Sequence, residues 1–311
     1  MKVLVTGGAG LIGSHLVENL LTKNNEVIVI DNLSSGRLEN LPKDKRLKIV
    51  KGDVRNFSLL SKIAKGCEQI YHLAEYIPET KKFGEGHVIK FSTIAPLEDL
   101  KVNVGGTLNV LEIARLYDCK VIFTSSAAVY GKHMEKIKED FVPRPISPYG
   151  VFKLTNEMLC NVYSELYGIP FAIARIFNTY GPRQRKYLMY DVLLKLKKDP
   201  KKLVLLGSEK QERDFIFVKD AVDALLLIAK KVKNQAVNVG NGKPIKIIDV
   251  VRCICKIKKI KPKVCFSGKS WPGDIEKLVA DNTKLKSLGY KQQYSLEKGL
   301  KELIKWFDKT E

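Results

Sequence analysis

Tyr149 and Lys153 are the residues of this chain whose types and spacing most directly permit chemistry. They lie four residues apart in a segment predicted to be helical, so both side chains project from one helix face. An ammonium group beside a phenol stabilises the phenolate, and we expect it to lower the pKa of Tyr149 from about 10 toward working pH. Tyr149 would then accept a proton from an alcohol. Taken alone, this spacing also occurs by chance on surface helices.

A serine hydroxyl is predicted to lie beside this pair. The apolar run that begins at Lys120 ends in Thr124, Ser125 and Ser126, as a buried strand would. Parallel sheets bind ligands at the carboxyl ends of their strands. Ser126 is therefore predicted to share the substrate oxygen with Tyr149.

A second pattern predicts a dinucleotide site. The strand-like segment Val3–Thr6 runs into Gly7-Gly8-Ala9-Gly10-Leu11-Ile12-Gly13, and a helix is predicted to follow. Glycines permit a tight turn and close backbone approach, and a helix N-terminus favours phosphate. A second predicted strand ends at Asp31, eighteen residues after Gly13. A carboxylate there accepts the ribose hydroxyls of a dinucleotide.

The charge of Asp31 disfavours a 2′-phosphate, so NAD is predicted rather than NADP, with Arg37 as the feature that keeps NADP as an alternative. After the third strand, Asp53 either accepts a hydrogen bond from the adenine amino group or is a solvated turn residue.

The order of predicted elements indicates an α/β protein. Short β-branched runs alternate with longer amphipathic segments, which is typical of a doubly wound parallel sheet. Long helices are expected over residues 99–117 and from Pro148 to Tyr167, the second closed by Gly168. We expect a nucleotide-binding domain over residues 1–177, joined by about 213–240, and a smaller mixed substrate domain over 178–311.

Composition excludes several classes. The 311 residues are 45% hydrophobic and can bury a large core, and no apolar run has the roughly 20 residues of a membrane span. The six cysteines fit no zinc or redox spacing, so free thiols, no metal and a cytoplasmic location are expected. The net charge of +20 lies largely in lysine runs without a nucleic-acid motif. It favours a lysine-rich surface that attracts anionic ligands over nucleic-acid binding.

Taken together, the motifs resemble those of extended short-chain dehydrogenase/reductases, and among them the UDP-glucose 4-epimerase family. Those that carry the resemblance, in order along nearly the whole chain, are Thr6–Gly13, Asp31–Gly36, His72–Ala74, Asn103, Ser125–Gly131, Tyr149–Lys153, Asn178–Gln184 and Arg213–Ile216. The resemblance implies a Rossmann-type fold, NAD as cofactor and a UDP-hexose as substrate. It also implies a homodimer that pairs through the helices over 99–117 and 148–167.

The resemblance also implies roles for individual residues. Tyr149 would be the base, Lys153 would tune it and hold the nicotinamide ribose, and Ser126 would share the substrate hydroxyl. NAD would be held, besides Tyr149 and Lys153, by Gly7, Gly10, Leu11, Ile12, Gly13, Asp31, Asn32, Ser34, Ser35, Gly36, Asp53, Val54, Leu73, Ala74, Asn103 and Ser125. The nucleotide sugar would contact Ser126, Asn178, Arg213, Lys269, Trp271 and Asp274.

The reaction implied is epimerisation at C4 of the sugar. Relatives that dehydrate or decarboxylate carry an acidic residue after the serine, where this chain has Ala127 and Ala128, which move no proton. The remaining cycle passes a hydride from C4 to NAD, turns the 4-keto sugar and returns the hydride to its other face. Another nucleotide sugar, a uronic acid or an N-acetylhexosamine, stays open as substrate. A non-catalytic NAD-sensing regulator is an alternative of another class, which the intact Tyr149, Lys153 and Ser126 disfavour.

Three departures bear on the substrate. The stretch between Ala74 and Asn103 is roughly ten residues longer than the family pattern. Just after the His-Leu-Ala motif, where relatives have a basic residue, this chain has Glu75, Tyr76 and Ile77, so one phosphate contact is either missing or supplied by Lys81 or Lys82. Residues 271–274 read Trp-Pro-Gly-Asp where an Arg-Pro-Gly-Asp motif would grip the diphosphate. Trp271 could stack on a base or sugar, with Lys269 supplying the charge, or could simply pack.

Overall fold

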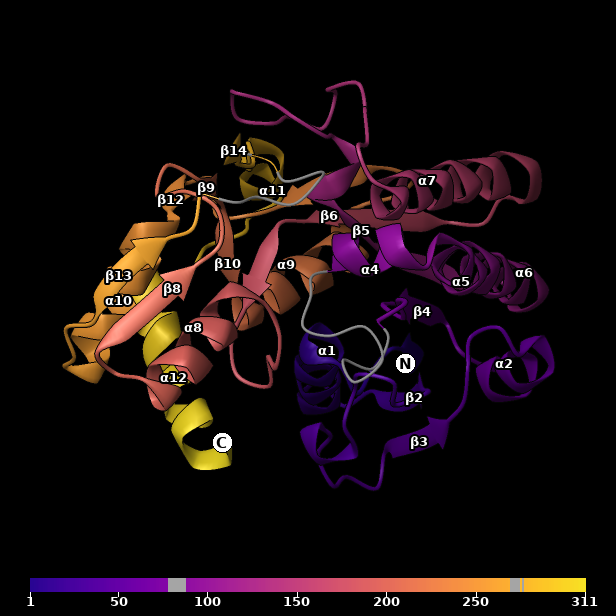
Figure 1. Cartoon of the computed structure of the whole chain (residues 1–311). Helices are drawn as coiled ribbons and strands as arrows, with labels where there is room; N and C mark the ends of the chain where they lie inside the picture. Colours follow the sequence, from indigo (N-terminus) through magenta and orange to yellow (C-terminus); the bar gives the residue numbers. More distant parts are fainter. Residues whose placement is uncertain (78–87, 269–274, 276) are drawn as a thin grey trace.

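A computed structural model gives the structure of the chain and describes residues 1–77, 88–268, 275 and 277–311. Within these ranges, seven parallel strands form the central sheet (Figure 1). Their spatial order is β11 (Ala236–Val239), β6 (Phe171–Ile176), β5 (Lys120–Ser126), β4 (Gln69–His72), β1 (Lys2–Thr6), β2 (Glu26–Asp31) and β3 (Leu47–Lys51). The strand order reverses between β1 and β4, and such a switch point is where open parallel sheets bind ligands. The predicted doubly wound α/β fold is confirmed.

Helices cover both faces of the sheet, which explains why its strands are nearly continuous apolar runs. One face packs against α1 (Leu11–Thr22) and α9 (Val218–Lys231), with α11 (Thr283–Ser287) at the edge. The other packs against α2 (Phe57–Ala64), α6 (Gly106–Tyr117) and α7 (Pro148–Tyr167).

The register aligns the ends of the central strands. Thr6 at the end of β1 lies beside Ile30 on β2 and His72 on β4. Because the strands end level, the glycine loop, Asp31 and Leu73 emerge at the same edge of the sheet.

Helix α7 has the predicted bounds and the expected caps. The Ser147 side chain accepts a hydrogen bond from the Gly150 N–H, and Pro148 occupies the first turn. Gly168 closes the helix with φ +73°, a left-handed conformation that glycine adopts without strain. The capping fixes where Tyr149 and Lys153 leave the helix.

The expected long helix over residues 99–117 is present, but it contains a π-helical turn. The segment is divided into α5 (Pro96–Leu100), a π-helical turn from Lys101 to Gly105, and α6, with α4 (Val88–Ile94) before it. In this wider turn the Asn103 carbonyl accepts hydrogen bonds from Asn156 Nδ2 on α7 at 3.0 Å and from Thr107 Oγ1 at 2.5 Å. A contact with a neighbouring helix of this kind leaves no trace in the hydrophobic period.

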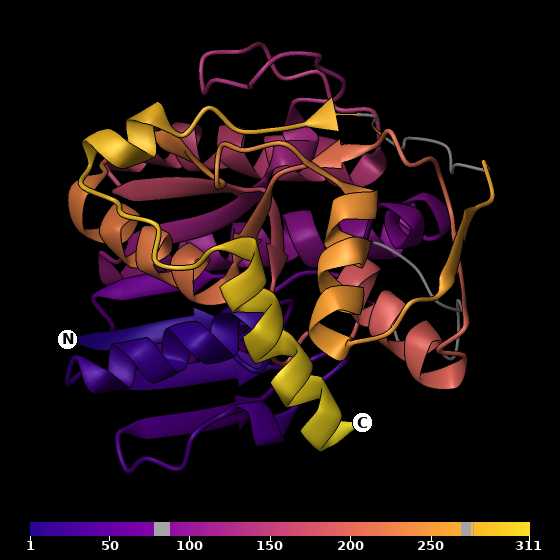
Figure 2. The ribbon, with the colours of Figure 1, turned by 90° about the vertical axis from the view of Figure 1, so that its left-hand side faces the viewer.

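The C-terminal part forms a smaller mixed unit with its own core (Figure 2). Its helices α8 (Tyr187–Lys198), α10 (Ile247–Lys258) and α12 (Leu296–Thr310) pack together, α10 and α12 side by side. Its strand pairs are β7 (Asn178–Tyr180) with β10 (Phe215–Phe217), β8 (Lys202–Leu205) with β13 (Lys263–Phe266), and β9 (Glu212–Arg213) with β12 (Ile245–Lys246) and β14 (Lys277–Leu278).

Across the described ranges, no helix combines the length and apolar character needed to cross a bilayer. In the same residues no cluster of three or more His, Cys, Asp or Glu side chains is placed to hold a metal ion. All six cysteines are free thiols.

Candidate active site

A cavity of ≈ 790 Å³ lies at the carboxyl edge of the sheet, between the central sheet and the C-terminal unit. It falls in the size range of ligand and cofactor sites. Its walls include the glycine loop, Asp31 and Asp53 together with Ser126, Tyr149 and Lys153. Asn178 and Arg213 reach it from the C-terminal unit. The structure therefore brings the predicted dinucleotide residues and the predicted catalytic residues into one site.

The glycine loop has the shape that a pyrophosphate needs. A Cβ atom on Gly13 would lie 2.2 Å from the Gly7 carbonyl oxygen, and one on Gly7, which has φ +69°, would lie 2.8 Å from the Ala74 nitrogen. Helix α1 begins at Leu11 without a side-chain cap and without an acidic residue in its first turn. Its first N–H groups and its dipole therefore face the cavity ready for an anion. The loop fits a dinucleotide phosphate.

Asp31 closes the adenosine end of the cavity. Its carboxylate accepts hydrogen bonds from the Ala9 N–H at 2.9 Å and the Leu33 N–H at 2.8 Å, which fix its orientation. Burial raises its pKa, partly offset by these two hydrogen bonds. Arg37, the feature that kept NADP open, instead pairs with Glu39 at 3.3 Å. The arrangement fits the two hydroxyls of an unphosphorylated ribose.

Replacing Asp31 with asparagine is expected to weaken NAD binding by about 10- to 100-fold, the loss of a hydrogen bond to a charged group. Binding of NADP should weaken less, because the repulsion of its 2′-phosphate disappears with the charge. Titration of the variant with each cofactor measures both affinities. Equal losses for NAD and NADP would contradict a role for this carboxylate in choosing between them.

Asp53 is held by a neighbouring cation. Its carboxylate accepts from Arg55 Nε and Nη2 at 2.9 and 2.8 Å and from Asn32 Nδ2 at 3.3 Å. These hydrogen bonds, led by those of Arg55, lower the pKa of Asp53 to about 2. Asp53 lies on the cavity wall as a fixed anion, and Arg55, which holds it, was not foreseen from the sequence.

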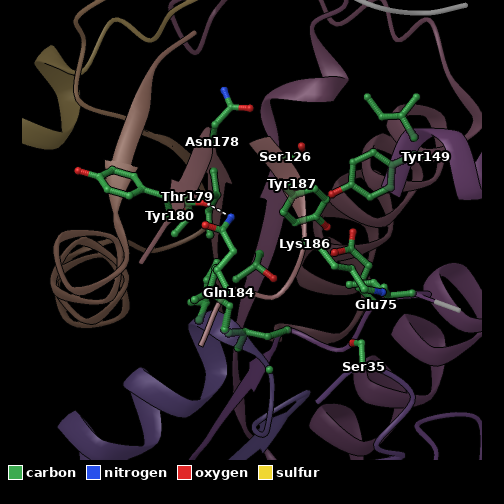
Figure 3. Close-up of a pocket in the computed structure, with 18 of the residues that line it drawn as sticks. Ser35, Glu75, Ser126, Tyr149, Asn178, Thr179, Tyr180, Gln184, Lys186 and Tyr187 are labelled. Carbon is green, nitrogen blue, oxygen red and sulfur yellow. Dashed lines mark hydrogen bonds between the residues drawn. The ribbon is translucent and has the colours of Figure 1, made fainter. Parts of the chain in front are cut away.

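The Tyr149 side chain lies in the cavity in the same region as Ser126 and Glu75 (Figure 3). The Ala128 N–H donates to Ser126 Oγ at 3.2 Å. Both Ser126 and Glu75 are near enough to the Tyr149 phenol to affect its pKa, which Ser126 lowers and Glu75 raises. Ser126 and Tyr149 are therefore adjacent, as predicted, and both line the cavity.

The expected effect of Lys153 on this phenol is wrong for the protein as it stands. Burial and then the charge of Glu75 raise the pKa of Tyr149 well above its ordinary value of 10. Lys153 Nζ lies 5.7 Å from the centre of the Tyr149 ring, donates to the Thr124 carbonyl at 3.0 Å and lies 3.5 Å from Glu75 Oε1. Burial is the largest cause of this raised pKa, and burial could not be read from the spacing of Tyr149 and Lys153 in the sequence.

A buried ion pair holds α7, the helix that carries Tyr149 and Lys153, against the central sheet. Arg175 Nη2 donates to Glu157 Oε2 at 2.7 Å, and Ser125 Oγ donates to Glu157 Oε1. Arg175 Nη1 also donates to the Tyr130 hydroxyl at 2.7 Å. Glu157 is one helical turn after Lys153, so the pair fixes α7 against the ends of β5 and β6. This network was missed in the sequence, where Glu157 and Arg175 belong to no motif.

The C-terminal unit forms the part of the cavity wall where the substrate residues Asn178 and Arg213 were predicted. Asn178 Nδ2 and Arg213 Nη1 both donate to backbone carbonyls, those of Asp214 at 3.2 Å and Glu212 at 2.9 Å. Asp214, from the same motif as Arg213, is buried and accepts the backbone N–H groups of Asn241, Gly242 and Ala280. Burial raises its pKa to about 6. Asp214 thus fixes the backbone at Asn241, Gly242 and Ala280, and the Arg213 side chain lies at the cavity wall.

Tyr187 was not anticipated from the sequence. Its ring packs beside Tyr149 at the start of α8 (Figure 3), with φ +72°, an uncommon conformation for an aromatic residue. The strained backbone turns the phenol into the cavity.

Two residues predicted to hold NAD do not line the cavity. Asn103 is 2% exposed, and its side chain accepts from the Tyr76 N–H at 3.3 Å and donates to Asp99. Gly36 packs against the glycine loop at Ala9 and against Asp31. A Cβ atom on Gly36 would lie 2.9 Å from Asp31 Oδ2. The predicted substrate residues Lys269, Trp271 and Asp274 lie outside the described residues, as do residues 78–87 of the lengthened stretch.

The fold and site together define an extended short-chain dehydrogenase/reductase. The sequence model of the family described as GDP-mannose 4,6 dehydratase matches residues 4–303, and the chain belongs to that family.

Named relatives agree with this placement. A putative UDP-glucose 4-epimerase of Methanocaldococcus jannaschii is 35% identical, with 98% of this chain and 97% of the relative covered. The solved UDP-glucose 4-epimerase of Thermotoga maritima, determined with UDP-glucose, has a TM-score of 0.91 at 31% identity and covers 100% of this chain and 99% of its own. The UDP-glucuronic acid 4-epimerase of Bacillus cereus, solved with UDP-glucuronic acid and NAD, has a TM-score of 0.88 at 30% identity, with 100% of both chains covered.

Proposed function

We propose that this protein is an NAD-dependent 4-epimerase of a UDP-hexose of the UDP-glucose and UDP-galactose type. The observation that carries the proposal is the shared cavity, in which a Ser126–Tyr149 hydroxyl pair lies beyond a glycine loop that fits a dinucleotide. Solved 4-epimerases of this fold, determined with UDP-glucose or with UDP-glucuronic acid and NAD, support the proposal by analogy. The roles of individual residues are argued from their chemistry.

Each residue has a physical task in the reaction. NAD, when bound, supplies a reversible hydride acceptor. Ser126 and Tyr149 hold the sugar hydroxyl that loses its proton, and Tyr149 moves that proton away from and back to the oxygen. Lys153, fixed by the Thr124 carbonyl, places a positive charge beside the ribose end of the cofactor site. Arg213 offers a permanent cation to the diphosphate or uridine.

The absence of an acidic residue directly after Ser126 in the sequence favours epimerisation over elimination. Ala127 and Ala128 form a short 3₁₀ turn directly after β5, with Ala128 at the cavity wall. Neither exchanges a proton. The 4-keto sugar would therefore be reduced again rather than lose water or carbon dioxide.

A turnover panel tests the proposal. Purified protein, without added cofactor, is incubated with UDP-glucose, UDP-galactose, UDP-N-acetylglucosamine and UDP-glucuronic acid, and products are separated by chromatography. Interconversion of UDP-glucose and UDP-galactose is expected, and denaturation should release NAD. A uronic acid is the second candidate substrate, because the Bacillus cereus relative was solved with one. Failure to convert any member of the panel would contradict the proposal, and a non-catalytic NAD sensor would then be favoured.

We further propose a cytoplasmic homodimer, in which residues 1–177 with about 213–240 hold NAD and the remainder holds the sugar. The free thiols fit a reducing compartment. Helix α7 carries a row of exposed apolar side chains at helical spacing: Val151, Met158, Val162 and Leu166, 44 to 67% exposed. Exposed Leu97 and Leu100 on α5 and Leu116 on α6 add to this surface. A second copy would bury it.

Met158→Glu is expected to convert the dimer to a monomer, because it puts a charge at the middle of the α7 row. Size-exclusion chromatography with light scattering gives the mass directly. Val142→Glu is the matched control, because Val142 is an apolar residue that is 67% exposed and lies outside α7. This variant should leave the dimer intact. A Met158→Glu protein of unchanged mass would exclude α7 as the interface.

A further inference from the structure

The His72 side chain joins two segments that lie far apart in the sequence. At one end of its ring the Thr6 hydroxyl lies 2.7 Å from Nδ1, and at the other end the Thr107 hydroxyl lies 3.0 Å from Nε2. All three side chains are at most 1% exposed, so these hydrogen bonds are shielded from bulk water. The chemical steps of the proposed reaction use none of the three.

At the Thr107 end, a carbonyl fixes the direction of the hydrogen bond. Thr107 Oγ1 donates to the Asn103 carbonyl at 2.5 Å, because a carbonyl oxygen only accepts. The one hydrogen of this hydroxyl is thus used, so Thr107 accepts from the Nε2–H group of His72. The same carbonyl accepts at 3.0 Å from Asn156 Nδ2 on α7, three residues after Lys153. This end of the ring is therefore linked to the helix that carries Lys153.

At the Thr6 end, two backbone groups fix the direction. Thr6 Oγ1 accepts hydrogen bonds from the N–H groups of Leu73 and Ala74 at 3.2 and 3.1 Å. Both acceptor positions of the hydroxyl are filled, so it donates to His72 Nδ1. Leu73 and Ala74 line the cavity, and a Cβ atom on Gly7 would lie 2.8 Å from the Ala74 nitrogen. This end therefore holds the cofactor wall, formed by Leu73 and Ala74, against the glycine loop.

One neutral tautomer of His72, with its hydrogen on Nε2, satisfies both ends. Burial, and then the charge of Lys153, lowers the pKa of this histidine to about 3, which agrees with a neutral ring. A hydrogen on Nδ1 would instead point at a hydroxyl whose acceptor positions are filled, which is costly in a buried site. The His72 backbone adds a third link. Its carbonyl accepts from Thr124 Oγ1 at 3.0 Å, and the Thr124 carbonyl accepts from Lys153 Nζ at 3.0 Å.

We propose that His72 is a positioning residue that fixes the spacing between the cofactor wall and the helix of Lys153. This role rests on the proposed function, in which the two sides of the cavity act together on one sugar carbon. A misplacement of about 1 Å costs about 10²-fold in rate, so a rigid connection between the two sides supports catalysis. The ring keeps its hydrogen throughout and acts only through its neighbours.

Removal of either hydroxyl is expected to affect both sides of the cavity. In Thr107→Val the Nε2–H group loses its acceptor, so the ring is no longer held and its bond to Thr6 weakens. Thr6→Val has the same effect from the other end. Each variant should release bound NAD about tenfold faster and lower kcat about tenfold, with little change in the KM of the UDP-sugar. Urea denaturation checks that each variant is folded under the assay conditions.

The double variant and a control make this comparison specific. Because the hydrogen bonds act as one unit, Thr6→Val with Thr107→Val should again change each property about tenfold, whereas independent losses would multiply to about 100-fold. Thr310→Val is the matched control, because it removes an exposed hydroxyl that donates to the Trp306 carbonyl at 3.0 Å. This control should behave as wild type.

A spectroscopic measurement needs neither turnover nor cofactor. The chain has four histidines, and long-range ¹H–¹⁵N correlation spectra of protein labelled with ¹⁵N-histidine show which ring nitrogens carry hydrogen. Signals that change in both threonine variants belong to His72, and they should show hydrogen on Nε2 alone.

Three results would overturn this role: the absence of such a signal, hydrogen on Nδ1, or a Thr107→Val protein that lowers kcat but releases NAD as wild type does. Wild-type protein that converts no UDP-sugar would instead refute the proposed function. The spectra and the NAD release rates would still decide whether His72 connects the two sides of the cavity.

Discussion

Tyr149→Phe is expected to lower kcat by about 10²- to 10⁴-fold, the factor that a positioned proton-transfer group contributes. The ring fills the same space beside Ala128, so the fold and the cofactor site should be unchanged. The substrate KM should change little, because the hydroxyl acts on the transition state more than on the bound sugar. Steady-state kinetics with UDP-glucose, alongside NAD titration, separates these effects.

The matched control is Tyr167→Phe on the same helix. Tyr167 is 50% exposed and lies at the far end of α7. Removal of its hydroxyl should leave kcat equal to the wild-type value within experimental error. Comparable activity in Tyr149→Phe and wild type would remove Tyr149 from the chemistry.

Glu157→Gln is expected to lower the free energy of unfolding by about 3–5 kcal/mol, because it leaves the Arg175 guanidinium buried without its counter-charge. The pair is 9% and 4% exposed on its two side chains, so water cannot compensate. Urea denaturation monitored by circular dichroism measures the change. Since the pair fixes the helix that carries Tyr149 and Lys153, activity should fall as well.

Two comparisons make this second prediction specific. Glu302→Gln breaks the more exposed pair between Glu302 and Lys219 and should cost at most about 1 kcal/mol. Adding Arg175→Met to Glu157→Gln removes the unpaired charge and should restore part of the lost stability. A loss as small as that of Glu302→Gln would show that the buried pair does not hold α7 in place.

Much of the fold could be predicted because its signals are local. The glycine loop, the apolar strands and the capped helix α7 each depend on residues close together in the chain, and each was found within a few residues of its expected position. Tyr149, Ser126 and Lys153 could also be placed together, because the carboxyl end of a parallel strand and the start of a following helix meet at one sheet edge.

The remaining features depend on contacts between distant segments. Glu157 meets Arg175 only when α7 lies against β6. In the same way, the π-helical turn at Asn103 accepts a hydrogen bond from Asn156, which lies on another helix. In the sequence, Glu75 stood out only because relatives have a basic residue just after the same motif. Its effect on the phenol follows from burial, and burial is a property of the whole fold.

The central claim is that one cavity removes a hydride from a UDP-hexose and returns the same hydride to the opposite face. The most direct measurement is conversion of UDP-glucose that carries deuterium at C4, with no reductant or cofactor added beyond what the purified protein retains. The expected product is UDP-galactose that keeps its deuterium at C4. Loss of the deuterium to water, or the absence of UDP-galactose, would contradict it.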